Sequence, residues 1–143
     1  ASGGTVESGM KEGRGIRGFS LTPPCAGEKE RDVSARIIRY LRVRGWRCQR
    51  QQSGLARFLG GGAPVRIGEP GMADWLCLRP LCEGLAEVFY LEVKAPGGKL
   101  SEAQQEWLRR RTVERFEAVT AHSLEWFDAW YRKRFPGQEE KAA

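Results

Sequence analysis

The fold class of this chain is decided by residues 88–98, which read VFYLEVKAPGG. A run of β-branched and aromatic residues stops at a proline and two glycines, which predicts a strand that ends at Val93. Side chains alternate along a strand, so Glu92 and Lys94 are expected on one face and Leu91 and Val93 on the other. Taken alone, this pattern is also typical of an ion pair on an exposed strand.

Apolar periodicity predicts helices both before and after this strand in the sequence. The predicted order is helix, strand, strand, strand, helix, strand, helix, over residues 29–44, 46–52, 73–78, 88–93, 101–115 and 118–121 and from Ser123 onward. Residues 54–71 hold three consecutive glycines and two prolines and predict a long functional loop. We therefore expect an α/β domain over residues 28–135, with a small mixed four-stranded sheet flanked by helices. Residues 1–27 and 136–143 are expected to be flexible tails.

The composition favours a polyanionic partner. The 143 residues include 24 Lys and Arg against 18 Asp and Glu, a net charge of +6. No apolar run approaches the roughly 20 residues of a membrane helix, and no leader opens the chain, so we expect a cytoplasmic protein with no membrane partner. The four cysteines form no CxxC pair and the single histidine is distant, which favours free buried thiols in a reducing compartment over a zinc site.

Asp74 and Glu30 are two further candidate site residues. Asp74 follows a glycine turn and opens an apolar strand, a common place for a structural aspartate. Adjacent strands lie about 5 Å apart, so Asp74 and Glu92, one hairpin apart, could share a hard cation such as magnesium, which proteins hold with one or two carboxylates. Glu30 falls on the helical wheel amid the apolar stripe of Val33 and Ile37, and an unpaired buried charge there is costly.

Together these residues resemble the VRR-NUC branch of the PD-(D/E)XK nucleases over residues 28–121. The resemblance rests on Gly71-x-x-Asp74, on residues 92–101 (EVKAPGGKLS), on Gln104 and on the helix that carries Glu30. It implies a restriction-endonuclease-like core and a metal-dependent DNA endonuclease that acts on branched or flapped DNA, such as Holliday junctions. It also implies a possible homodimer and an intracellular setting, nucleoid-associated or phage-encoded.

The resemblance also implies roles for individual residues. Asp74, Glu92 and the Val93 carbonyl would hold Mg²⁺ (or Mn²⁺), and Lys94 would orient or deprotonate the attacking water. Glu30 would reach the site through water or help a second ion. Gln104 would lie near the water or the phosphate. We expect the metal-free site to have raised carboxyl pKa values.

Gln104 also has a purely structural interpretation. Ser101 and Gln104 fit a capping box, with the serine at the N-cap and the glutamine three residues later. The two interpretations of Gln104 are compatible, and the sequence favours neither.

Basic residues supply candidate nucleic-acid contacts and an alternative function. Those singled out are Arg36 and Arg39 on the first helix, Arg57 and Arg66 around the glycine loop, and Lys99 after the glycine turn. A solvated helix face explains the helical arginines equally well, whereas phosphate contacts would make them a binding ridge. The alternative function is a nucleic-acid-binding module that uses this arginine-rich face and does not cleave. The aromatic residues of the last helix are expected in the core or in a dimer contact.

Overall fold

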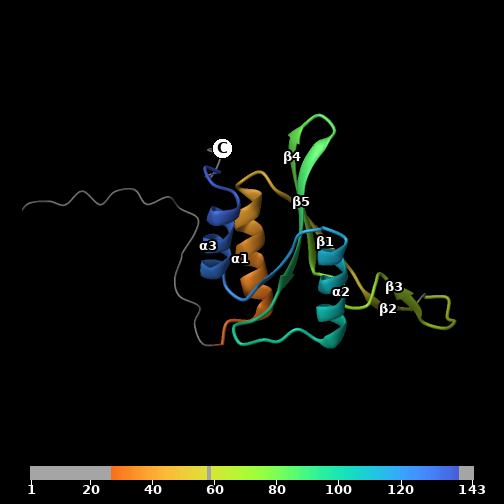
Figure 1. The fold of residues 1–143 in the computed structure, drawn as a ribbon. Coiled ribbons are helices and arrows are strands. Elements are labelled where there is room, and N and C mark those ends of the chain that lie inside the picture. Colours follow the sequence, from red (N-terminus) through yellow and green to blue (C-terminus); the bar gives the residue numbers. More distant parts are fainter. Residues whose placement is uncertain (1–26, 58, 139–143) are drawn as a thin grey trace, which may run out of the picture.

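The structure, a computed structural model, describes residues 27–57 and 59–138. It is a mixed α/β fold with a four-stranded mixed sheet and helices on both faces, as predicted (Figure 1). The elements are α1 Glu30–Arg42, β1 Arg47–Arg50, β2 Gly54–Ala56, β3 Val65–Ile67, β4 Trp75–Cys82, β5 Leu85–Val93, α2 Glu102–Val113, β6 Ala118–Ala121 and α3 Leu124–Arg134. Residues 1–26 and 139–143, most of the expected tails, lie outside the described residues.

The main sheet has the order β1-β4-β5-β6. β1 pairs antiparallel with β4 and β4 antiparallel with β5, whereas β5 and β6 are parallel. Parallel neighbours need a crossover connection, and α2 provides it between β5 and β6. The strand on which the sequence prediction centred, β5, is therefore an inner strand with partners on both sides.

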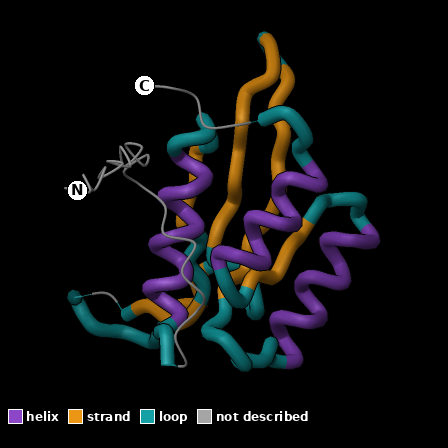
Figure 2. The backbone as a smooth tube through the Cα atoms, turned by 90° about the vertical axis from the view of Figure 1, so that its left-hand side faces the viewer, coloured by secondary structure: helices purple, strands orange, loops and turns teal. Residues whose placement is uncertain are grey.

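The alternation along β5 separates two packing layers. Figure 1 shows α1 and α3 side by side on one side of the sheet and α2 on the other, and Figure 2 shows the same three helices after a quarter turn. Phe89, Leu91 and Val93 are buried in the core shared with α1 and α3. Tyr90 points the other way and packs edge-on against Trp107 of α2, with ring centroids 4.9 Å apart. The core therefore lies on one face of β5, and α2 covers the other.

The two flanking helices of the core form as the periodicity predicts. Val33, Ile37 and Leu41 of α1 are fully buried. Ser123 caps α3, because its side chain accepts a hydrogen bond from the Trp126 N–H. Phe127 of α3 is also fully buried, so the aromatic side of this helix belongs to the core. No helix within the described ranges has the length and apolar character needed to cross a membrane.

Two loop predictions are wrong. β4 continues to Cys82 and β5 begins at Leu85, so a tight turn replaces the longer connection expected between the strands at 73–78 and 88–93. Pro80 has no N–H to donate to a neighbouring strand. It lies at a register shift between Pro80 and Cys82, where a proline is tolerated. The expected loop at 54–71 contains the short hairpin β2–β3, whose β3 residues are all exposed. The alternation of Val65, Arg66 and Ile67 covers only three residues and buries neither face, which is too short to predict a strand from the sequence.

Candidate active site

Asp74 and Glu92 face each other across the β4–β5 pair. Trp75 pairs with Leu91, so the residue before Trp75 stands opposite the residue after Leu91. The Asp74 N–H donates to Glu92 Oε2 at 3.2 Å, and the Val93 N–H donates to Asp74 Oδ2 at 3.1 Å. The backbone of each strand thus holds the carboxylate of the other, which fixes both groups at one end of the sheet.

Three polar side chains from different elements surround this pair. Lys94 Nζ lies 3.1 Å from Glu92 Oε1 and 3.9 Å from Glu30 Oε2. The Gln104 amide donates to the same Glu92 Oε1 at 2.6 Å. The structure therefore brings together all five residues that the sequence singled out for chemistry. They come from α1, from the start of β4, from the end of β5 and from α2.

Glu30 is the member of this group whose environment differs from the expectation. The helical wheel placed it amid the apolar stripe, yet its side chain is 50% exposed. It is the first residue of α1, and the buried residues of that helix begin only at Val33. Glu30 therefore avoids the cost of a buried charge while its carboxylate still faces Lys94.

Glu92 has a strongly perturbed acidity. Its side chain is 1% exposed, and this burial, together with the nearby Asp74 carboxylate, raises its pKa from 4.5 to about 7. Hydrogen bonding and charge from Lys94 oppose the rise without cancelling it. The expectation of a raised carboxyl pKa is confirmed for this residue. A cation bound beside Glu92 and Asp74 would favour the charged carboxylates and so oppose this rise in pKa.

Gln104 meets the structural requirement and also reaches the carboxylates. The Ser101 N–H donates to Gln104 Oε1 at 2.9 Å, and the Gln104 N–H donates to Ser101 Oγ at 3.2 Å. This is the predicted capping box at the start of α2. The cap uses the amide oxygen and leaves the amide nitrogen to donate to Glu92. The same side chain thus starts the helix and ties it to β5.

A close contact that the sequence analysis missed fixes the turn before Asp74 against α2. Gly71 has φ +73°, and a Cβ there would lie 2.1 Å from the Ala103 carbonyl oxygen. Glu69 on the same turn accepts hydrogen bonds from Trp107 Nε1 at 2.8 Å and from Arg111 at 3.0 Å. The glycine of the Gly71-x-x-Asp74 motif thus allows backbone contact with the helix that carries Gln104. In the sequence, the only sign of this contact is the glycine itself, which permits a positive φ.

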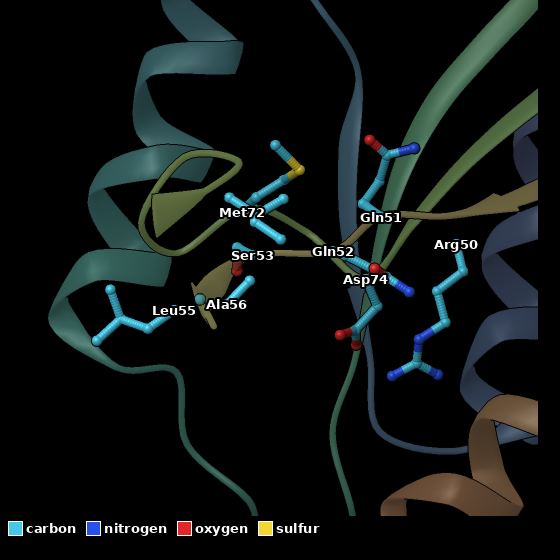
Figure 3. A pocket seen from close by; sticks show the side chains of 10 residues that line it. Arg50, Gln51, Gln52, Ser53, Leu55, Ala56, Met72 and Asp74 are labelled. Carbon is cyan, nitrogen blue, oxygen red and sulfur yellow. The ribbon is translucent and has the colours of Figure 1, made fainter. Parts of the chain in front are cut away.

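A pocket of about 490 Å³ opens beside Asp74. Its walls come from β1 and the segment after it, from β2 and β3, and from Met72 (Figure 3). In Figure 3 the side chains of Asp74 and Arg50 extend to the same side of the segment that carries Gln51 and Gln52. The pocket is exposed and mostly polar, so a large ligand can reach Asp74 through it. Arg50 adds positive charge to the wall of the pocket.

The donor set at this end of the sheet suits a hard cation of low protein coordination. No group of three or more metal-ligating side chains occurs within the described ranges. Magnesium needs fewer, because it keeps water and substrate oxygens and uses only one or two carboxylates. Asp74 and Glu92 supply two, and among the described residues none donates a hydrogen bond to Asp74 Oδ1. Two carboxylates at one strand end are a donor set of the kind that Mg²⁺ or Mn²⁺ uses.

The predicted nucleic-acid contacts are dispersed. Arg36 makes ion pairs with Glu28 at 3.0 Å and with Glu125 of α3 at 3.4 Å, so it ties α1 to α3. Arg39 is exposed on α1. Arg57 and Arg66 are exposed on and beside the β2–β3 hairpin that borders the pocket, and Lys99 is exposed in the turn before α2. Arg50, which lies next to Asp74, was not singled out, although counting the β1–β4 register from Trp75 could have found it.

No family model, no curated protein and no solved structure matches this chain.

Proposed function

We propose that this protein is a metal-dependent endonuclease that hydrolyses phosphodiester bonds in DNA, with a restriction-endonuclease-like core of the VRR-NUC type. The observation that carries the proposal is the Asp74–Glu92 pair, held across two strands with Lys94 Nζ 3.1 Å from Glu92. Two carboxylates and one amine at a strand end, next to an open pocket with a basic wall, suit a charged phosphodiester better than a small apolar ligand.

Each residue of the site has a separate role in the proposed reaction. Asp74, Glu92 and the Val93 carbonyl would hold Mg²⁺ or Mn²⁺, which supplies Lewis-acid polarisation of the phosphate and a more acidic water. Lys94 lies beside Glu92 and is positioned to orient the attacking water or to offset charge on the phosphate. Gln104 and the Asp74 N–H hold the Glu92 carboxylate in place. Glu30 reaches Lys94 from α1, with its Oε2 3.9 Å from Lys94 Nζ, and helps to orient the amine.

The experiment is a cleavage assay on labelled four-way junction, flap and linear duplex DNA with Mg²⁺, Mn²⁺ or EDTA. Asp74→Ala, Glu92→Gln and Lys94→Met should each lower the cleavage rate by about a hundredfold or more. Glu102→Gln and Lys133→Met, at exposed positions outside the site, are the matched controls and should cleave as the wild type does. Cleavage that persists in EDTA, or in all three site variants, would overturn the proposal. Retarded DNA without cleavage in any metal would favour the non-cleaving binding module.

A further inference from the structure

A second groove, separate from the pocket of Figure 3, lies on the α1 side of the sheet. It has a volume of about 510 Å³ and lies between one side of α1 and the strands β1 and β4. The residues that give it its character are Arg31, Ile38, Arg39 and Arg42 of α1, Arg50 of β1 and Trp75 of β4. We call it the α1 groove.

The charge of the α1 groove is of one sign. Four arginines line it, and among the described residues no aspartate or glutamate does. The ion pair of Arg31 with Asp32, at 3.5 Å, joins two side chains that are 78% and 53% exposed, so water screens it strongly. Arg36, whose carboxylate partners bind it to α3, is not part of the lining. The groove therefore suits a polyanion.

The floor of the α1 groove is apolar and contains a fixed indole. Trp75 Nε1 donates to Ser34 Oγ at 3.0 Å, which holds the ring in one orientation. The Arg50 guanidinium lies 5.5 Å from the centre of that ring. Ile38 adds aliphatic surface. A simple phosphate site does not need an indole and an isoleucine, whereas a nucleobase stacks on such a surface.

The α1 groove is directly connected to the candidate active site. Trp75 is the residue after Asp74, and β-strand alternation sends the two side chains to opposite faces of the sheet. Arg50 pairs with Trp75 and lines both the α1 groove and the pocket beside Asp74. One nucleic-acid strand could thus follow Arg50 from the groove around the edge of β1 to the carboxylates.

We propose that the α1 groove binds an unpaired segment of the DNA substrate, with the arginines of α1 on its phosphates and Trp75 under a base. In a duplex the base faces are stacked on one another and only base edges, sugars and phosphates are exposed, so the ring of Trp75 has no base face to stack on. An unpaired strand offers phosphates and base faces together. The proposal rests on the proposed nuclease function for its choice of DNA.

The test is binding of fluorescent DNA in EDTA, where no cleavage occurs, to the full chain and its variants. The probes are a nicked duplex and the same duplex with an unpaired 5′ or 3′ arm. The double variant Arg39→Gln/Arg42→Gln and the single variant Trp75→Leu remove charge and ring separately. Arg47→Gln/Arg110→Gln is the matched control, because Arg47 is exposed on β1 at a position that alternates with Arg50 and Arg110 is exposed on α2. Circular dichroism checks that each variant is folded.

Both groove variants should lose about tenfold in affinity for the armed duplex and less than about twofold for the nicked duplex. The double variant should also flatten the salt slope for the armed duplex by roughly two units, one for each lost phosphate contact. Equal losses on both probes, or no loss on either, would overturn the proposal. If Trp75→Leu does not fold, the double variant alone decides.

These outcomes are independent of the cleavage assay. A protein that never cleaves, but whose groove variants lose the armed duplex selectively, would contradict only the nuclease proposal. A protein that cleaves in Mg²⁺, but whose groove variants bind like the wild type, would contradict only the groove proposal.

Discussion

Gln104 donates its amide N–H to Glu92 at 2.6 Å while its amide oxygen caps the first turn of α2. One side chain therefore performs a structural and a site-related task with different atoms, and substitution can separate them. Glu at this position is the other standard residue of a capping box, yet it has no donor to offer Glu92.

Gln104→Glu should keep the helix cap and disturb the site, whereas Gln104→Ala should lose both. We expect Gln104→Ala to lower the free energy of unfolding by about 1 kcal/mol. Gln104→Glu should retain most of that energy but raise the pKa of Glu92 further, because a second carboxylate replaces the donor. The carboxyl ¹³C shift of Glu92, followed by NMR against pH, measures this. Gln105→Glu is the control, since the Gln105 side chain donates to the Leu100 carbonyl instead.

The stability of the metal-free protein should fall as pH rises through neutrality. Glu92 has a pKa of about 7 in the fold against 4.5 in the unfolded chain, so between these values the native state holds a proton that the unfolded state has released. The contribution of Glu92 to stability is complete below pH 4.5 and is lost by about pH 8, a change of about 3 kcal/mol. Urea titrations at pH 5 and pH 8 measure it. Glu92→Gln should flatten the dependence, and equal slopes in both proteins would contradict the assignment.

Gly71→Ala should damage the fold more than an equally strained glycine elsewhere. Gly71 and Gly84 have φ values of +73° and +76°, but a Cβ meets the Ala103 carbonyl oxygen only at Gly71 and open space at Gly84. Gly84→Ala should therefore cost about 1 kcal/mol from backbone strain alone. Gly71→Ala should cost clearly more, because the turn before Asp74 must also separate from α2. Thermal unfolding of the two variants gives the comparison, and similar costs would show that the contact is unimportant.

The cysteines should react in an order set by burial. Cys48, Cys77 and Cys82 are free, with Cys77 buried, Cys48 partly buried and Cys82 exposed, so the expectation of buried thiols is wrong for Cys82. Cys48 and Cys77 are cross-strand partners, and hydrogen bonding to Cys48 together with burial raises the pKa of Cys77 well above its usual range. In a Cys25→Ser variant, which removes a thiol outside the described residues, iodoacetamide should label Cys82 first and Cys77 only on unfolding. Mass spectrometry of the modified peptides reads the order.

The sequence predicted the parts of this fold that have one buried side. The stripe of Val33, Ile37 and Leu41 leaves a clear period in the sequence because one face of α1 is buried, and residues 88–93 (VFYLEV) stand out by their β-branched and aromatic side chains. The exposed β2–β3 hairpin leaves only the three-residue alternation of residues 65–67, and the far end of the β4–β5 hairpin leaves no clear period. Their strands are held by backbone hydrogen bonds, which any side chain permits.

The charged side chains of the candidate site could be predicted from the sequence. The contacts that depend on how distant segments pack together could not. Asp74, Glu92 and Lys94 are recognisable from their spacing and charge. The approach of Gly71 to Ala103 and the position of Arg50 beside Asp74 depend on how segments far apart in the chain are docked. The sequence shows that a glycine or an arginine is present, but only the tertiary structure shows which residue it contacts.

β5 directs positions 89, 91 and 93 to the core, whereas position 92 and Lys94, the residue after the strand, belong to the site. Inserting one residue within this strand would exchange the two sets, leaving phenylalanine and leucine facing α2 and carrying charge into the apolar interior. Evolution can therefore vary the chemistry of this strand by replacing residues, but not by changing its length.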